Sequence, residues 1–188
     1  MYIGIEGIDF TGKSTLIELL KQELPEYSFI REPGETSIGE ELREVILNDS
    51  SLSSKERTVL FDADRILTKL CYGEEENLVS DRTFVSDIAY KMADGGDVEG
   101  LKAHHENLGV RRPDLLILLT VSEKVFIERK ANRIEEEDIF DKDGIEKAMR
   151  RQEAYLDLIE TLGINTLLLS SDDGVERLIK TIIERIGE

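Results

Sequence analysis

The sequence predicts an α/β fold of three layers, in which a parallel sheet of five strands is covered by helices on both faces. Short apolar runs alternate along the chain with longer amphipathic stretches, as expected where each strand is followed by a helix that crosses back over the sheet. The chain has 188 residues, of which 40% are hydrophobic, and this is enough to bury one core. Neither an internal repeat nor a low-complexity tract divides it, so we expect a single domain over residues 1–188.

Five apolar runs are the predicted strands, and the segments between them have helical spacing. The strands cover residues 2–6, 28–31, 78–80, 115–121 and 166–169. Helices are expected over residues 122–132 and 144–162. Asp172 and Asp173 precede the last amphipathic stretch, and we expect them to cap its helix.

A further helix is expected between the second and third strands. Ser53 and Glu56 form a capping-box sequence at its start. Cys71, the single cysteine of the chain, lies near its end between Leu70 and Tyr72. These apolar neighbours suggest a half-buried, reduced thiol.

The charge balance limits the possible partners. There are 24 basic and 41 acidic residues, which gives a formal net charge of −17. Such a chain repels nucleic acids and anionic membranes, so any phosphate ligand must be held by a local basic cluster. The longest apolar run, residues 115–119, is far shorter than a membrane span of roughly 20 residues. We therefore expect a soluble, cytoplasmic protein with no nucleic-acid or membrane partner.

A glycine-rich sequence follows the first predicted strand directly. It matches the pattern G-x-x-x-x-G-K-[ST] with Gly7, Ile8, Asp9, Phe10, Thr11, Gly12, Lys13, Ser14 and Thr15. Glycines allow backbone N–H groups to close around a phosphate, and the start of the next helix adds its positive end. Lys13 would then bridge the β- and γ-phosphates of ATP, and the Ser14 hydroxyl would ligate Mg²⁺. The alternative is a glycine-rich turn that only caps a helix.

This glycine-rich sequence, the P-loop, also occurs in GTPases, ATPases and many small-molecule kinases. The molecule that accepts the phosphoryl group must therefore be inferred from the remaining basic residues. The chain has no Asn-Lys-x-Asp sequence, which argues against a GTPase. Arg31 stands at the end of the second predicted strand, Arg82 follows the third within Asp81-Arg82-Thr83, and Arg65 lies between them in the sequence. Ligands of open α/β sheets bind at the carboxyl ends of strands, so these arginines could converge on an acceptor phosphate. The Asp9 carboxylate would face a sugar hydroxyl rather than a phosphate.

Six ordered motifs resemble the thymidylate kinase family over nearly the whole chain. They are the P-loop with Asp9, Arg31-Glu32-Pro33-Gly34, Leu60-Phe61-x-Ala63-Asp64-Arg65, Asp81-Arg82 with Ser86, Ala89 and Tyr90, Arg112-Pro113-Asp114-Leu115, and Asn132-Arg133-Ile134-Glu135 with Phe140 and Tyr155-Leu156. Six motifs in the same order are more specific than any one of them.

The resemblance implies a P-loop kinase fold and a role for each matching residue. For the sugar and phosphate of the acceptor, Asp9 is similar to the acid that contacts the 3′-hydroxyl, Tyr90 is similar to the ring that disfavours a 2′-hydroxyl, and Arg31 and Arg82 are similar to the phosphate ligands. For the base, Phe61 is similar to the ring that stacks on it and Arg65 to the residue that binds its edge, while Ser86 is similar to a base or phosphate contact. Asp81 is similar to the carboxylate that organises the water shell of Mg²⁺. Core packing of Phe61 and Tyr90, and a helix-capping role for Ser86, are the alternatives.

This chain departs from the family pattern at several positions. Glu35 stands where a second glycine is usual, and Asp87 and Lys91 stand where a small polar residue and a glutamine are frequent. A carboxylate at Asp87 can still accept the N3–H of a pyrimidine. In part of the family an arginine of the P-loop stabilises transfer, but here that position is Phe10.

A cation from elsewhere must therefore stabilise the transfer. Arg129 and Arg133 are four residues apart and share a helix face, so a lid over about residues 129–141 could bring both to the phosphates. The alternative for these arginines is ion pairing with the acidic run 135–137.

Together with the P-loop, the resemblance implies ATP:dTMP phosphotransfer with Mg²⁺, giving dTDP, and a homodimer. Its interface would use the helices after the second and third strands, although Leu60, Leu67 and Leu70 could equally be core. The catalytic residues expected are Lys13, Asp9, Arg82, Arg129 and Arg133. Two alternatives stay open: a P-loop kinase for another deoxynucleotide or small metabolite, and a non-catalytic nucleotide-sensing module.

Overall fold

The computed structural model describes residues 1–132 and 144–187 and confirms the predicted fold class. The strands are β1 (Tyr2–Glu6), β2 (Ser28–Arg31), β3 (Leu78–Asp81), β4 (Leu115–Thr120) and β5 (Thr166–Ser170). They form one parallel sheet in the order β2-β3-β1-β4-β5. Each strand begins at the predicted residue and ends within one residue of the predicted end.

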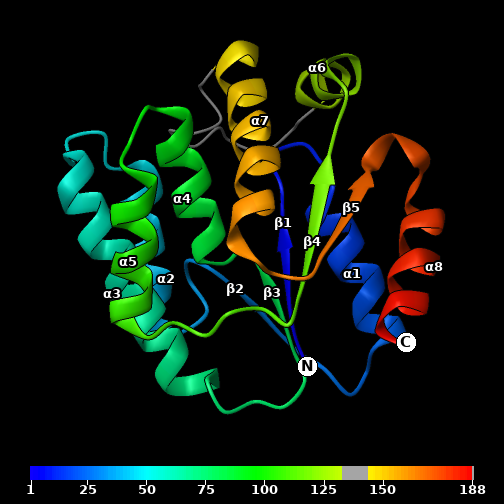
Figure 1. The fold of residues 1–188 in the computed structure, drawn as a ribbon, viewed down its shortest axis with the longest axis horizontal. Helices are drawn as coiled ribbons and strands as arrows, with labels where there is room; N and C mark the ends of the chain where they lie inside the picture. Colours follow the sequence, from blue (N-terminus) through cyan, green and yellow to red (C-terminus); the bar gives the residue numbers. More distant parts are fainter. Residues whose placement is uncertain (133–143, 188) are drawn as a thin grey trace.

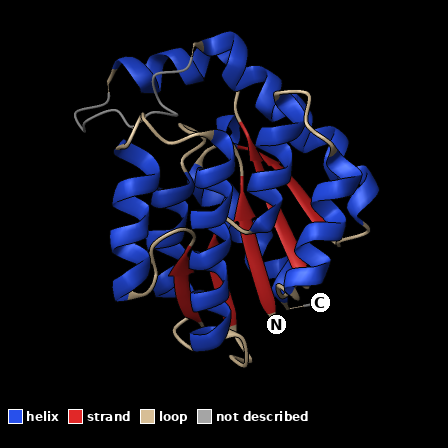
Figure 2. Ribbon diagram, turned by 90° about the vertical axis from the view of Figure 1, so that its left-hand side faces the viewer, coloured by secondary structure: helices blue, strands red, loops and turns tan. Residues whose placement is uncertain are grey.

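The helices form the outer layers of the fold. They are α1 (Lys13–Glu23), α2 (Ser37–Asn48), α3 (Ser54–Tyr72), α4 (Phe84–Ala93), α5 (Val98–Leu108), α6 (Glu123–Ala131), α7 (Ile145–Leu162) and α8 (Val175–Ile186). In Figure 1, α1 and α8 cover one face of the sheet, and α4 and α7 cover the other, with α5 outside α4. Figure 2 shows the strands enclosed between these layers. Within residues 1–132 and 144–187, no helix is long and apolar enough to cross a membrane.

Alternation along the central strands divides the core in two. Ile3 and Ile5 of β1 and Ile117 of β4 pack with Leu16 of α1. Leu116 and Leu118 of β4 point to the opposite face and pack with Tyr155 of α7 and Ile88 of α4. Successive side chains of a strand point to opposite faces, so the apolar runs are continuous because both faces are covered.

The ends of two helices test the predicted caps. The capping box at Ser53 and Glu56 is confirmed, since Ser53 N donates to Glu56 Oε2 at 2.8 Å and Glu56 N donates to Ser53 Oγ at 3.3 Å. The cap predicted from Asp172 and Asp173 is wrong. Ser171–Asp173 form a 3₁₀ turn instead, and Gly174, with φ 86°, precedes α8 without a side-chain bond.

The predicted half-burial of Cys71 is also wrong, because the thiol is exposed. Cys71 lies in the last turn of α3, where its neighbour Leu70 is 77% exposed as well. Apolar neighbours in the sequence therefore did not indicate burial here.

Candidate functional site

The P-loop runs from the carboxyl end of β1 into the N-terminus of α1, and two glycines make this path possible. Gly7 has φ 143°, and a Cβ there would lie 2.5 Å from the carbonyl oxygen of Leu119. Gly12 has φ 86° and directly precedes α1. Phe10 is left-handed as well, with φ 64°, a conformation that a non-glycine residue adopts at some energetic expense, often at functional sites. The loop thus leads to a helix N-terminus, which favours anions.

Lys13 is folded back over the P-loop. Its Nζ donates to the carbonyl oxygens of Gly7 at 3.0 Å and Ile8 at 2.9 Å. Burial and the nearby Arg82 lower the pKa of Lys13 to about 8, against the opposing effect of Asp9 and Asp81. The ammonium is therefore largely charged near neutral pH and lies where a phosphate bound to the loop would need it.

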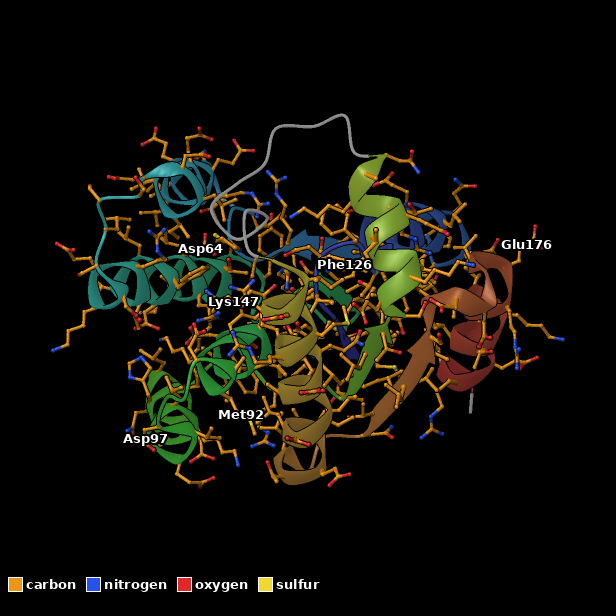
Figure 3. The ribbon with its side chains drawn as sticks, turned by 90° about the horizontal axis from the view of Figure 1, so that it is seen from above. Asp64, Met92, Asp97, Phe126, Lys147 and Glu176 are labelled. Atoms are coloured by element: carbon orange, nitrogen blue, oxygen red, sulfur yellow. The ribbon has the colours of Figure 1, made fainter. Side chains whose placement is uncertain are left out.

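A cavity of about 320 Å³ lies beside the P-loop, between α3, α4 and α7. In Figure 3, which looks onto the carboxyl ends of the strands, Lys147 lies on the side of α7 that is turned toward α3 and α4. Among the described residues that line the cavity, seven are basic and four are acidic. This local excess of positive charge, in a chain of net charge −17, is the basic cluster that an anionic ligand requires.

The end of the cavity nearest the P-loop, here called the P-loop end, consists of Asp9, Arg82, Tyr90 and Arg151. Arg82 follows β3 with φ 70°, and its Nη2 donates to Asp9 Oδ1 at 2.6 Å. Its Nη1 donates to the carbonyl oxygen of Gly7 at 3.2 Å. Arg82 therefore ties the P-loop to the wall of the cavity.

Asp9 remains ionised in this setting. Burial alone would raise its pKa, but Arg82, Lys13 and Arg151 together lower the pKa below its ordinary value. The carboxylate can therefore only accept hydrogen bonds. This agrees with a sugar hydroxyl as its ligand.

Glu6, which the sequence analysis did not identify, holds several residues behind the P-loop end through hydrogen bonds. Its carboxylate is fully buried and accepts hydrogen bonds from Thr83 N at 2.7 Å, Ser86 Oγ at 2.6 Å and Tyr155 Oη at 2.9 Å. Ser86 in turn accepts from Arg82 Nη1 at 3.2 Å. An acid at the end of an apolar strand, directly before the P-loop, was the available signal.

The opposite end of the cavity, here called the α3 end, consists of Phe61, Arg65, Asp87 and Lys91. Arg65 is 5% exposed, and its Nε donates to Glu32 Oε2 at 3.1 Å. Its guanidinium carbon lies 5.8 Å from the centre of the Phe61 ring. Burial raises the pKa of Glu32 to about 7, with Asp64 adding to the rise and Arg65 opposing it.

Asp87 is held from two helices. Its carboxylate accepts from His105 Nε2 of α5 at 3.1 Å and forms an ion pair with Lys91 Nζ at 3.1 Å. Burial would raise the pKa of Asp87, but His105, Arg65 and Lys91 lower it to about 2. Asp87 is thus a fixed, ionised acceptor beside Arg65.

The structure brings most of the predicted acceptor residues together, with Arg31 as the exception. Asp9, Phe61, Arg65, Arg82, Ser86, Asp87 and Tyr90 all line the cavity. Arg31 is not among the described residues that line it. Its side chain is 48% exposed, and its Nη2 forms an ion pair with Glu40 of α2 at 3.6 Å.

One of the two predicted lid arginines contacts the P-loop. Arg129 lies in α6, and its Nη1 donates to the carbonyl oxygen of Phe10 at 2.8 Å and to Ser171 Oγ at 3.1 Å. It therefore holds the P-loop against the 3₁₀ turn. Arg133 and most of the predicted lid, residues 133–141, lie outside the described residues.

The predicted Mg²⁺ ligands both lie near Lys13, since Ser14 follows it in the chain and the charge of Asp81 acts on its ammonium. Asp81 is the last residue of β3, and its Oδ1 is buried without a hydrogen-bond partner among the described residues. Ser14 is exposed in the first turn of α1. Residues 1–132 and 144–187 contain no cluster of three or more metal-binding side chains. Mg²⁺ bound to nucleotide phosphates needs only one or two protein ligands, so Asp81 and Ser14 fit this ion.

Arg151 of α7 is a further wall residue that the sequence reasoning did not identify. It is 3% exposed, and its guanidinium carbon lies 4.3 Å from the centre of the Tyr90 ring. The signal was present in the helical spacing, since Ala148, Tyr155 and Leu158, on the same stripe of α7, are buried too.

Comparison with known proteins gives a consistent result. Residues 5–182 match the sequence model of the family described as Thymidylate kinase. The thymidylate kinase of Sulfurovum sp. is 36% identical, over 97% of this chain and 97% of its own length. That of Wolinella succinogenes is 34% identical, over 97% and 96%. In fold, the chain is similar to the thymidylate kinase of Candida albicans, with a TM-score of 0.76 and 22% identity over 99% of this chain and 90% of that one.

Proposed function

The chain belongs to the thymidylate kinase family, and we propose that its cavity takes dTMP while its P-loop takes the phosphates of ATP. The reaction transfers the γ-phosphoryl group of ATP to dTMP, giving dTDP and ADP. The observation that carries this assignment is Arg82, which lines the cavity and bonds Asp9 and Gly7 of the P-loop. Donor and acceptor phosphates would meet at this residue.

Little covalent assistance is required for this transfer. An oxygen of a phosphate monoester is already a competent nucleophile near neutral pH, so no general base is obligatory. The main task is to hold two anions together and to stabilise the charge that spreads over the γ-phosphoryl oxygens. Lys13 and Arg82 are placed for this, and Arg129 with Arg133 would add charge from the lid.

Mg²⁺ would be held by Ser14 and Asp81 together with the phosphates. When bound, the ion neutralises charge on the phosphate oxygens. The orphaned Oδ1 of Asp81 supports this role.

The α3 end would recognise the thymine base. Phe61 supplies a ring for stacking, Arg65 can donate to the O4 carbonyl, and Asp87 can accept from N3–H. Cytosine presents an amino group and an unprotonated N3 instead, which oppose both residues. Tyr90 would crowd a 2′-hydroxyl and favour deoxyribose.

Turnover with dTMP tests this function. The purified chain with ATP and Mg²⁺ should form dTDP and ADP in equal amounts when dTMP is added, as measured by ion-exchange chromatography. Without dTMP, ADP release should be far slower. Release of ADP at the same rate without any acceptor would show an ATPase and not this kinase.

We also propose a homodimer that uses one exposed stripe. On α3, Val59, Ile66 and Leu70 are 65%, 41% and 77% exposed, and on the adjacent α2, Ile38 and Val45 are 57% and 42% exposed. The α3 residues are spaced seven and four apart, so they share one face. Exposed apolar patches of this kind mark protein interfaces.

Sedimentation of the Leu70→Glu variant tests the dimer. A charge in the stripe should shift the protein toward monomer, whereas Ile127→Glu on α6, 53% exposed elsewhere, should leave the mass unchanged. An unchanged mass in Leu70→Glu would rule out this interface. A cytoplasmic location stays a prediction from the shortness of the apolar runs, and the lack of nucleic-acid and membrane partners stays a prediction from the net charge of −17.

A further inference from the structure

The sequence predicts that Arg31 and Arg82 both bind the acceptor phosphate, but among the described residues that line the cavity only Arg82 is present. Arg82 lines the cavity, whereas Arg31 turns toward Glu40 of α2. The P-loop position where part of the family has an arginine is Phe10 in this chain, an uncharged side chain whose ring packs edge-on against Phe126 at 5.1 Å between ring centres.

Arg151 lines the cavity, as Arg31 was expected to do. It lines the cavity from α7, one turn after Lys147, and is 3% exposed. Its guanidinium lies over the Tyr90 ring at 4.3 Å, and the Arg82 guanidinium lies 5.6 Å from the centre of the same ring. Two guanidinium groups, one from α7 and one from the loop between β3 and α4, thus lie around one aromatic residue at the P-loop end.

The charges near Arg151 identify the chemistry of its ligand. Arg151 and Arg82 both act on Asp9, the carboxylate of the P-loop, so Arg151 belongs to the end where phosphoryl transfer occurs. The base-reading residues Phe61 and Arg65 lie at the other end. A planar guanidinium that is held over a ring loses little freedom on binding, and its fork matches the oxygens of a phosphate.

We propose that Arg151 is the second guanidinium ligand of the acceptor phosphate, in the role that sequence resemblance assigned to Arg31. This inference rests on the proposed function, since it requires a nucleoside monophosphate in the cavity. Arg82 and Arg151 hold the phosphate between them, and Tyr90 keeps both guanidinium groups in place beneath the sugar.

Binding of dTMP and thymidine to R151Q, measured by calorimetry, tests the proposal. Thymidine has the same base and sugar but no phosphate. We expect dTMP to bind roughly 10- to 100-fold more weakly to R151Q, as for the loss of a charge-assisted contact, with thymidine binding unchanged. R150Q is the matched control, because Arg150 is the neighbouring arginine and is exposed. It should bind both ligands as the wild type does.

Two results would overturn the role of Arg151. One is unchanged dTMP binding in R151Q. The other is an equal loss for dTMP and thymidine, which would mean that Arg151 only supports Tyr90. If R151Q does not fold, R151K gives the same test, because lysine keeps the charge but loses the two-point contact. R151K should then lose less affinity for dTMP than expected for R151Q and keep its affinity for thymidine. A ratio of the dTMP and thymidine dissociation constants equal to that of the wild type contradicts the proposal.

The proposed function is checked separately by wild-type turnover. No dTDP from dTMP would remove that function. Normal wild-type turnover together with unaltered dTMP binding in R151Q would remove only the role of Arg151.

Discussion

The two ends of the cavity use charge in different ways. At the α3 end, Arg65 is paired with Glu32, and Asp87 is paired with Lys91 and His105. At the P-loop end, Arg82, Lys13 and Arg151 surround the carboxylate of Asp9. Paired groups are fixed in direction before a ligand arrives and suit a neutral base edge, whereas several cations around one acid suit a phosphate. The first end should therefore govern acceptor choice and the second should govern rate.

The largest expected effect is at the P-loop end. Lys13→Ala should lower kcat by roughly 10³-fold or more, because it removes the charge closest to the transferring phosphoryl group. Steady-state kinetics with ATP and dTMP measure this. Lys21→Ala is the control, since Lys21 lies on the same helix and pairs with the exposed Glu18. Near wild-type turnover in Lys13→Ala would mean that this loop is not the phosphate site.

A substitution in α6, the helix that leads into the predicted lid, should have the next largest effect. Arg129→Ala should lower kcat by roughly 10²-fold while changing ATP affinity far less, as for contacts made mainly in the transition state. Its bond to the carbonyl of Phe10 already places it beside the P-loop. Lys124→Ala, an exposed position on the same helix, should keep full activity. Full kcat in the Arg129→Ala, Arg133→Ala double variant would show that the lid only covers the site.

A change at the α3 end should alter selectivity more than rate. Asp87→Asn replaces a pure acceptor by an amide that can also donate to the unprotonated N3 of cytosine. The ratio of kcat/KM for dTMP over that for dCMP should fall by about 10-fold, the value of one hydrogen bond to a base edge. If kcat with dTMP fell by orders of magnitude while this ratio held, the division between the two ends would be wrong.

The smallest effect is the pH profile of kcat/KM. Burial raises the pKa of Glu32 to about 7, so its ionised form, which pairs with Arg65, is lost as pH falls through 7. Burial and Arg82 lower the pKa of Lys13 to about 8, so its charge is lost as pH rises through 8. We expect a maximum between these values. Glu32→Gln should shift the acid limb down to the second ionisation of the dTMP phosphate, at about pH 6, and keep the alkaline limb.

The sheet could be predicted from the sequence, because strands that are covered on both faces consist of continuous apolar runs, such as 115–119. The sequence also predicted the P-loop, and all of the predicted acceptor-binding residues except Arg31 line the cavity, since those residues occur in short motifs. Arg151 was missed because it lies in a long helix where only its spacing relative to Ala148 and Tyr155 marks it as buried. Arg31 is at the end of a strand as predicted, but its side chain pairs with Glu40 of α2, a tertiary contact that no local pattern encodes.

Competition among acceptors tests the central claim most directly. Wild-type protein with limiting ATP and equal concentrations of dTMP, dCMP, UMP and dGMP forms products in proportion to their kcat/KM values. We predict that dTDP is the main product, with little UDP because of Tyr90 and little dCDP because of Asp87 and Arg65. More dGDP or UDP than dTDP would contradict the account of the cavity.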